Sequence, residues 1–180
     1  MTEYWLSEVE SIFKVPQHVL IHLCEKNVIV PDMQETGGRG SFRKFSDRNI
    51  FEFAVALELR KFQIPLSVIK ALLIVLSATC KKILSQRVHV SFVEAFKYLR
   101  ADLYVFDGAY VVLDFAKLQK NSDFAGTKDS QMFGIDIGGL LENQSNSVSL
   151  ERLQDLPNKF VGYLKISLSS ICSQVASEIQ

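Results

Sequence analysis

Hydrophobic residues near the start of the chain recur at helical spacing and predict two short helices. Ser7 and Glu10 have the spacing of a helix capping box, so we expect the first helix to begin at Ser7. Pro16 suits the first turn of the second helix. Two short helices with a brief connection are typical of a helix-turn-helix motif. The second helix has an apolar side, with Val19, Leu20 and Leu23, and an outer side, with Gln17, His18, Ile21, His22 and Glu25.

Two longer helices are predicted next. Ser46 can cap a third helix that ends near Arg60. A fourth helix is expected at residues 67–84, after an interruption at residues 62–65. Residues 72–76 are apolar on nearly every side, which is typical of burial in a core or in a subunit contact. The buried stripe of the third helix is expected to contain Ile50, Phe53, Ala54 and Leu57.

From Asp102 onward, apolar and polar residues alternate with a period of two, which predicts strands. The pair Asp107 and Gly108 lies between two such runs and predicts an antiparallel hairpin with a two-residue type I′ turn. Just before these runs, a short fifth helix is expected at residues 92–99, capped by Ser91.

The remainder of the chain predicts one more strand, at residues 132–137, between polar loops at residues 119–130 and 143–149. The end is interpreted as a strand over residues 163–168 followed by a helix over residues 169–179. One continuous helix from Phe160 is the alternative, because its apolar residues also fit a helical stripe.

A short segment between the second and third helices combines glycines, aromatic residues and positive charge. Gly37, Gly38 and Gly40 permit the positive φ angles of a hairpin tip. Phe42 and Phe45 can turn inward and leave the cationic side chains facing outward. Residues 36–48 contain four basic residues, Arg39, Arg43, Lys44 and Arg48, against the single acidic Asp47, a local net charge of +3. Such a patch suits contact with a phosphate backbone.

Charge is also divided unevenly between the halves of the chain, although the formal net charge is zero. Residues 1–100 carry 14 Lys and Arg against 10 Asp and Glu, and residues 101–180 carry 6 against 10. This asymmetry indicates a part that faces nucleic acid and an acidic part with another role. No apolar run approaches the roughly 20 residues that span a bilayer, so we expect a soluble, cytoplasmic protein without membrane contact.

Neither the cysteines nor the aspartates indicate a chemical site. Cys24, Cys80 and Cys172 are odd in number and far apart, and we interpret them as buried and reduced. Asp107 is explained by its turn, and the aspartates on strands are interpreted as solvated; these are Asp102, Asp114 and Asp136. No nucleophile elbow, phosphate-binding loop, dinucleotide fingerprint or zinc spacing is present. We therefore expect neither an enzyme nor a cofactor or metal.

The order and spacing of residues 1–75 resemble the winged helix-turn-helix domain of the MerR family of bacterial transcription regulators. Residues 5–9 resemble the opening helix of that family, and residues 15–31 its second helix and exit. Residues 40–46 resemble its first wing, with Arg43 at the wing arginine, and residues 59–66 lie where the family has its second wing. The fold class implied is α+β, with a DNA-binding domain at residues 1–85 and a small α+β domain at residues 86–180.

The resemblance implies a regulator that binds double-stranded promoter DNA as a homodimer and contacts RNA polymerase. The second helices would enter successive major grooves, with the wings on the flanking phosphates. Residues 72–76 of the apolar fourth helix, with Leu73 and Ile74 among them, and the C-terminal helix are candidate dimer surfaces. The alternative is that residues 101–180 cover the fourth helix within one chain. The residues expected to contact DNA are Pro16, Gln17, His18, Ile21, His22, Arg39, Arg43, Lys44 and Lys61.

Departures from the family pattern leave other functions open. The second helix carries His18, Ile21 and His22 where many members have arginines and tyrosines, and Lys14 replaces the usual turn glycine. The guanidinium fork of arginine is the commonest reader of guanine, and neither a neutral histidine nor an isoleucine can replace it. A protein-binding adaptor that uses the same helix pair is one alternative. An architectural DNA-binding protein, similar to phage excisionases, is the other.

Overall fold

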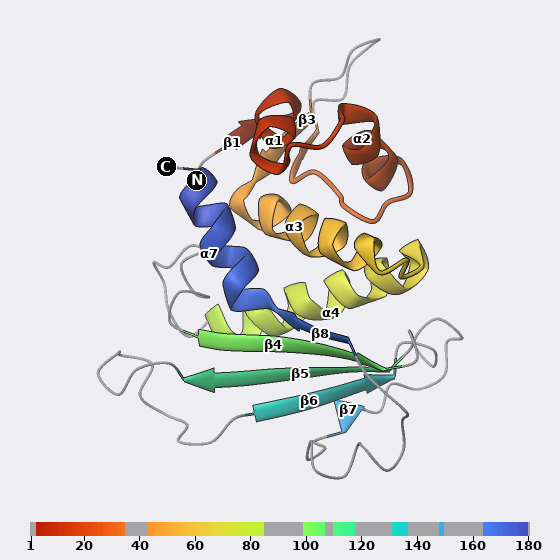
Figure 1. Ribbon diagram of the computed structural model, residues 1–180, viewed down its shortest axis with the longest axis vertical. Coiled ribbons are helices and arrows are strands. Elements are labelled where there is room, and N and C mark those ends of the chain that lie inside the picture. The colour runs from red at the N-terminus through yellow and green to blue at the C-terminus, as the bar shows by residue number, and fades with distance from the viewer. Residues whose placement is uncertain are drawn as a thin grey trace.

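The computed structural model describes residues 3–34, 43–84, 99–106, 110–117, 131–136, 148–149 and 164–179. These residues form helices and two antiparallel sheets, so the α+β class is confirmed. The small sheet and the first two helices lie at one end of the molecule, and the large sheet lies at the other (Figure 1). Helices α3 (Asp47–Lys61), α4 (Leu66–Leu84) and α7 (Leu168–Glu178) lie between the two ends (Figure 1).

The N-terminal end contains a three-stranded sheet with two short helices beside it. Its strand order is β1-β3-β2, and both pairings are antiparallel. The chain passes through β1 (Glu3–Trp5), α1 (Leu6–Phe13), α2 (Gln17–Glu25), β2 (Met33–Gln34) and β3 (Arg43–Ser46). Strands β2 and β3 are therefore the base of a hairpin, as the sequence predicted, and β1 is an additional strand that the sequence pattern did not reveal.

The predicted capping box of the first helix is wrong. Trp5 pairs with Lys44 of β3, so the chain leaves the strand at Trp5 and α1 begins directly at Leu6. This places Glu8, not Glu10, at the third helical position, where its carboxylate accepts a hydrogen bond of 2.6 Å from the Trp5 backbone N–H. Glu10 has another task, because its carboxylate accepts a hydrogen bond of 2.7 Å from the Gln17 amide of α2.

Helix α3 (Asp47–Lys61) is buried on nearly every side. Its predicted cap is confirmed, since the Ser46 hydroxyl accepts a hydrogen bond from the Asn49 backbone N–H. Ile50, Phe53 and Ala54 are buried as expected, and Leu57 is partly buried. The prediction of a single buried stripe is nevertheless incomplete, because residues on the other sides of the helix are also buried in the core. Buried there are Asn49, Phe51, Glu52, Val55, Ala56 and Leu59.

Helices α2 and α3 end in the same way. Each is followed by a residue with positive φ, Asn27 at 51° and Gln63 at 58°. After α3, the N–H of Gln63 donates to the Arg60 carbonyl, and that of Ile64 donates to the Leu59 carbonyl. Residues 23–28 repeat this pattern after α2. Such an ending satisfies carbonyls that a helix would otherwise leave without donors, and fixes the direction in which the chain leaves.

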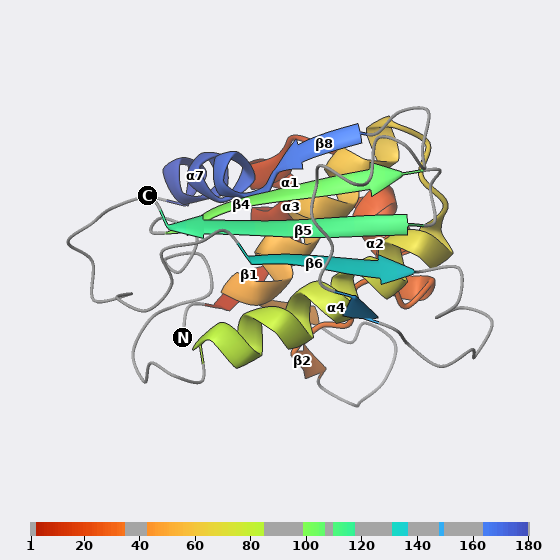
Figure 2. The ribbon, with the colours of Figure 1, turned by 90° about the horizontal axis from the view of Figure 1, so that it is seen from below.

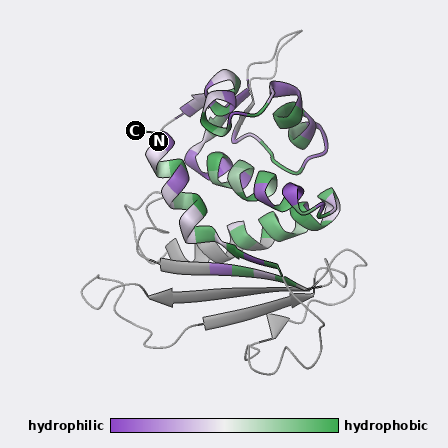
Figure 3. Ribbon diagram, viewed as in Figure 1, coloured by the Kyte–Doolittle hydropathy of each residue, from purple (hydrophilic) through white to green (hydrophobic). Residues whose placement is uncertain are grey.

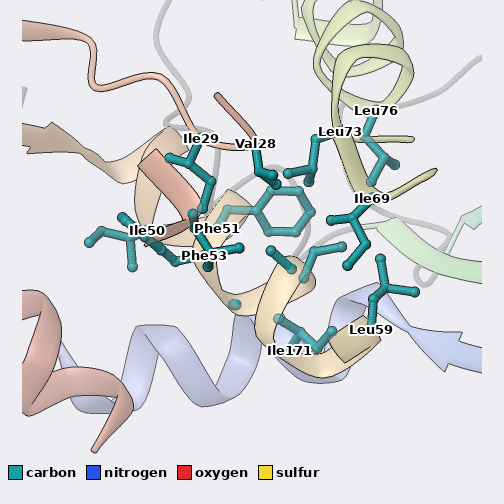
Figure 4. Close-up of a cluster of buried hydrophobic side chains, with 14 of the residues drawn as sticks. Val28, Ile29, Ile50, Phe51, Phe53, Leu59, Ile69, Leu73, Leu76 and Ile171 are labelled. Carbon is teal, nitrogen blue, oxygen red and sulfur yellow. The ribbon is translucent and has the colours of Figure 1, made fainter. Parts of the chain in front are cut away.

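Helix α4 (Leu66–Leu84) agrees with the predicted helix within one residue at its start. Most of its apolar side chains that the structure describes lie in the core of this one chain, where Leu73 lies beside Phe51 and Val28 (Figure 4). Leu73 is only 3% exposed, whereas its neighbour Ile74 is 61% exposed. Leu73 is therefore a core residue. The expectation that it belongs to a dimer surface is wrong.

The large sheet has the strand order β7-β6-β5-β4-β8. All its pairings are antiparallel. Its strands are β4 (Leu99–Phe106), β5 (Tyr110–Lys117), β6 (Gln131–Asp136), β7 (Val148–Ser149) and β8 (Leu164–Ser167). The predicted hairpin is confirmed as β4 and β5, and the predicted strand at 132–137 is confirmed as β6. Leu99, expected at the end of a helix, belongs to β4. The register pairs Phe106 with Tyr110, so three residues separate the strands and not the expected two.

Several predictions from the sequence concern residues outside the described part of the chain. These are most of the fifth helix, the turn at residues 107–109, the loop at residues 119–130 and most of the loop at residues 143–149. The last two residues of the second loop are described, and there the prediction is wrong, because they form β7. Of the cysteines whose side chains the structure describes, Cys24 and Cys172 are both buried, as expected. None of the helices that the structure describes has the length and hydrophobicity needed to span a bilayer.

Helix α7 (Leu168–Glu178) packs against α3 and β4 and connects the two ends of the molecule (Figures 1 and 2). The Ser167 hydroxyl caps it by accepting a hydrogen bond of 3.3 Å from the Ser170 N–H, so the alternative of one continuous helix is wrong. Ile171 and Val175 belong to the same buried cluster as α3. This cluster includes residues from both sides of the predicted domain boundary at residue 85, which itself stays a prediction.

Asp102 of β4 is buried and ion-paired, contrary to the expectation of a solvated strand face. It is 2% exposed, and its carboxylate lies 3.0 Å from the Lys165 ammonium of β8. The same ammonium lies 5.5 Å from the centre of the Tyr104 ring. The hydrogen bond to Asp102 raises the pKa of Lys165 above its ordinary value of 10.5. The pair joins the edge strand β8 to the sheet.

We predict that Leu73→Glu lowers the free energy of unfolding by more than about 3 kcal/mol, because it places a charge in a closed apolar core. Ile74→Glu is the matched control on the same helix, and it should change the free energy of unfolding by less than about 0.5 kcal/mol. Urea unfolding followed by circular dichroism measures both. Equal effects of the two substitutions would contradict the burial of Leu73.

We also predict that stability falls at alkaline pH through Lys165. Because its pKa is raised in the folded chain, the contribution of the ion pair is complete below about pH 10.5 and is lost as the pH rises through the folded pKa. Unfolding should be followed from pH 9 to about pH 12 for the unmodified chain and for Lys165→Met. The substituted chain should show a shallower loss, and parallel curves would exclude this role.

Candidate nucleic-acid interface

The two N-terminal helices meet at a tight turn of residues 14–16. Lys14 ends α1 in the left-handed conformation, with φ 53° and ψ 38°. Its N–H donates a hydrogen bond of 2.8 Å to the Glu10 carbonyl, and its ammonium lies 3.5 Å from Glu178 of α7. A residue with a side chain is strained in this conformation and glycine is not. The turn therefore has the left-handed backbone that glycine adopts without strain, but a lysine occupies it.

Helix α2 presents one face outward while its other face fixes it in place. Leu20 and Leu23 are fully buried, and Pro16 is the residue that precedes its first turn. The link from Gln17 to Glu10 holds the start of α2 against α1. As the sequence predicted, the outward residues are exposed or partly exposed. We call them the α2 face: Gln17, His18, Ile21, His22 and Glu25. Polar residues also lie along the outer parts of α1 and α2 in Figure 3.

Arg43 connects the hairpin base to α2. It pairs with Gln34 in the sheet, is half-buried, and its guanidinium lies close enough to the buried Cys24 of α2 to form a hydrogen bond. Burial raises the pKa of the Cys24 thiol above its ordinary value of 9.0, and the nearby Arg43 charge opposes this rise. The thiol is therefore neutral at physiological pH. Arg43 does more here than the sequence indicated, since it also ties two parts of the candidate site together.

Other basic residues predicted for a cationic patch have acidic neighbours. The Lys44 ammonium lies 2.9 Å from the Glu3 carboxylate and 5.0 Å from the centre of the Trp5 ring. Arg48 lies on α3 and interacts with Asp32 and Glu52. The net charge of +3 counted along the sequence is thus reduced in space by acids from outside the segment. Arg39 lies outside the described residues.

Asn49 is a buried polar residue beside the candidate site that the sequence analysis did not single out. Its side chain is fully buried, and its amide donates hydrogen bonds of 3.0 Å to the Val30 carbonyl and to Glu52. Its side-chain oxygen accepts from the backbone N–H groups of Asp32 and Ser46. These bonds fix the segment after α2 against the start of α3. The Ser-x-x-Asn spacing, a variant of the capping box, was the available signal for part of this arrangement.

Lys61 lies apart from the hairpin base, at the end of α3. Its ammonium is 2.5 Å from Glu58, in an exposed pair. The turn that follows α3 lies on the same side of the molecule as α2 in both views (Figures 1 and 2). The structure thus places α2 beside the hairpin base. The turn between α3 and α4 lies on the α2 side of the molecule, away from the hairpin base (Figures 1 and 2). In the described part of the chain, no three His, Cys, Asp or Glu side chains come together as a metal site, so His18 and His22 lack a third ligand there.

A scan of the chain against models of known protein families finds no match, and a search of curated proteins finds no significant similarity. The function must therefore be argued from the geometry of this site and from the resemblance of its residues to a family pattern.

We predict that Lys14→Gly raises the free energy of unfolding by about 0.5–1 kcal/mol. Removal of left-handed strain should outweigh the greater freedom of glycine in the unfolded chain. Lys14→Ala is the control, because it also loses the weak exposed pair with Glu178 but keeps a side chain at this position. Urea unfolding should show that Lys14→Gly stabilises the chain and that Lys14→Ala does not. Equal effects of the two substitutions would contradict the presence of backbone strain at Lys14.

Proposed function

We propose that this chain is a DNA-binding transcription regulator of MerR-like type, built on a winged helix-turn-helix. The observation that supports it best is the α2 face. A helix held from below by Leu20 and Leu23 presents polar side chains outward, with the hairpin base on one flank. A helix of this kind fits the major groove of B-DNA, which is about 12 Å wide.

The residues divide into base readers and backbone contacts. His18 and His22 lie four residues apart on the outer side of α2, and an imidazole can donate to or accept from a base edge. Arg43 and Lys44 lie on β3 at the base of the hairpin, where a cation meets phosphate better than bases. We expect modest sequence discrimination, because no described residue of the α2 face is an arginine.

The wider regulatory mechanism follows from the resemblance alone. Two copies would bind adjacent grooves and distort the promoter for RNA polymerase. The surfaces first considered for such a homodimer are used within the chain, since Leu73 and the apolar side of α7 lie in the core. Ile74 remains an exposed apolar residue on α4.

A protein-binding adaptor is the second candidate, and one observation favours it. The hairpin base is less cationic than its sequence suggests, because Lys44 faces Glu3 and Arg48 faces Asp32. Near these residues Trp5 is 43% exposed and Val30 is 55% exposed. Exposed apolar side chains beside balanced charges are more typical of contacts with protein than with a polyanion.

Retention of genomic fragments distinguishes the two candidates. The purified chain is incubated with pooled fragments at several salt concentrations, and bound DNA is sequenced. A regulator should retain a reproducible subset above 100 mM salt, with an affinity that falls steeply as salt rises. Binding that is absent even at low salt would reject the DNA proposal and leave the adaptor.

We predict that His18→Ala lowers affinity for a retained fragment by about fivefold, or about 1 kcal/mol, while affinity for random duplex is nearly unchanged. Arg43→Ala should weaken both DNAs alike and reduce the slope of log affinity against log salt by about one. Fluorescence anisotropy with labelled duplexes measures both quantities. Equal losses on both DNAs for His18→Ala would make it a backbone contact, and an unchanged slope for Arg43→Ala would remove that residue from the interface.

A further inference from the structure

Helix α7 is a weak helix by its own sequence. It has 11 residues, and four of them are serines: Ser169, Ser170, Ser173 and Ser177. Serine, valine, isoleucine and cysteine all favour a helix less than alanine does, and isolated helices shorter than about 12–15 residues are marginal in water. The first turn of α7 has no acidic residue and the last turn has no basic residue, so no charge within the helix complements its macrodipole. Packing against the rest of the chain therefore keeps α7 helical.

This packing involves one side of α7 only. Its buried residues are Leu168, Ile171, Cys172 and Val175, and they belong to the same cluster as α3 and β4. Ser173 and Gln174 on the other side are exposed. Few buried contacts and a solvent-facing backbone are typical of segments that open without global unfolding. Helix α7 can therefore leave the core while the other neighbours of α3 still hold it.

The two ends of α7 are fixed to different parts of the molecule. At its start, Ser167 is the last residue of β8, lies opposite Asp102 of β4 and caps the helix, so no linker separates the strand from the helix. At its end, the Glu178 carboxylate lies 3.5 Å from the Lys14 ammonium of the α1–α2 turn. Helix α7 thus extends from the edge of the large sheet to the turn that precedes α2 (Figure 1).

The α1–α2 turn depends on both α3 and α7. Phe13, the last residue of α1, lies against Phe53 of α3, with ring centres 6.2 Å apart. Lys14 follows, and its ammonium places a positive charge beside Glu178 in the last turn of α7, where the macrodipole favours a cation. Both side chains are exposed, so the pair contributes little to global stability. Its effect is local, because it joins a lysine in the left-handed conformation to the end of α7.

We propose that α7 is a detachable strap that couples the edge strand β8 to the α1–α2 turn. In the closed state, which the structure shows, α7 covers one side of α3 and its last residue contacts Lys14. In the open state α7 leaves α3, and the turn loses its ion pair and part of the support beneath Phe13. A displacement of β8 away from β4 favours the open state, because strand and helix are continuous at Ser167. The coupling goes beyond the proposed DNA binding and does not depend on it.

Hydrogen exchange of the full chain, followed by NMR at low urea concentrations, tests the strap without DNA. The amides of α7 and those of Lys14 and Val19 at the turn should exchange through one opening, faster than the amides of α3 and with a common urea dependence. Val175→Ala removes buried contacts of α7 and should accelerate exchange of both segments by about tenfold. Ser173→Ala, on the exposed side of the same helix, is the matched control and should accelerate neither.

The outcomes separate the opening of α7 from its coupling to the turn. If α7 exchanges as slowly as α3, it opens only in global unfolding and the strap is overturned. If Val175→Ala accelerates α7 alone, the coupling to the turn is overturned. Equal acceleration of the Gln63 amide, which lies far from α7 after α3, would show general loosening and would also overturn the proposal. Should Val175→Ala fail to fold, Ile171→Val removes one methylene and should accelerate both segments by about threefold.

Discussion

The burial of α3 on nearly every side is the constraint on which the rest of the structure depends. A helix with Phe51, Phe53 and Leu59 all in the core cannot be covered by one neighbour. The N-terminal helices, α4, β3 and α7 each supply part of the cover. The turn between α1 and α2 and the hairpin base are thus supported from beneath by α3. The last helix of the chain is needed for this support, because Ile171 and Val175 close one side of α3.

The polar residues at the start of α3 convert this packing into a defined geometry. Apolar contact alone sets the distance between elements but allows small shifts of one against another. Asn49 removes that freedom, since its amide bonds the segment after α2, the capped start of α3 and Glu52 at once. Leaving any of these buried groups without a partner would cost about 1–3 kcal/mol. The relative position of α2 and the hairpin base is therefore fixed by hydrogen bonds and not by apolar packing alone.

Local sequence signals predicted the features that depend on neighbours along the chain. The Ser46 cap, the extent of α4, the β4–β5 hairpin and the outward face of α2 all follow from spacing within a few residues. The failures involve distant partners. Strand β1 exists because residues 3–5 pair with β3, with Trp5 opposite Lys44. Because α1 begins directly after Trp5, the capping glutamate is Glu8 and not the predicted Glu10. Period-two alternation cannot show that Asp102 would meet Lys165 of a strand far along the chain.

The sequence pattern also cannot show which basic residues have acidic partners from distant parts of the chain. These partners decide which basic residues of the candidate interface can contact a phosphate. Lys44 and Glu3 form a partly exposed pair, which is worth little and can give way to a phosphate. Arg48 differs, because its partner Asp32 also accepts a hydrogen bond from the buried Ser46 hydroxyl, so freeing Arg48 would disturb the cap of α3. Arg43 is intermediate, tied to a neutral thiol that offers a weak acceptor. Contact with a polyanion would therefore recruit Lys44 and Arg43 and leave Arg48 in its structural role, so that sequence charge overstates the cationic surface by at least one residue.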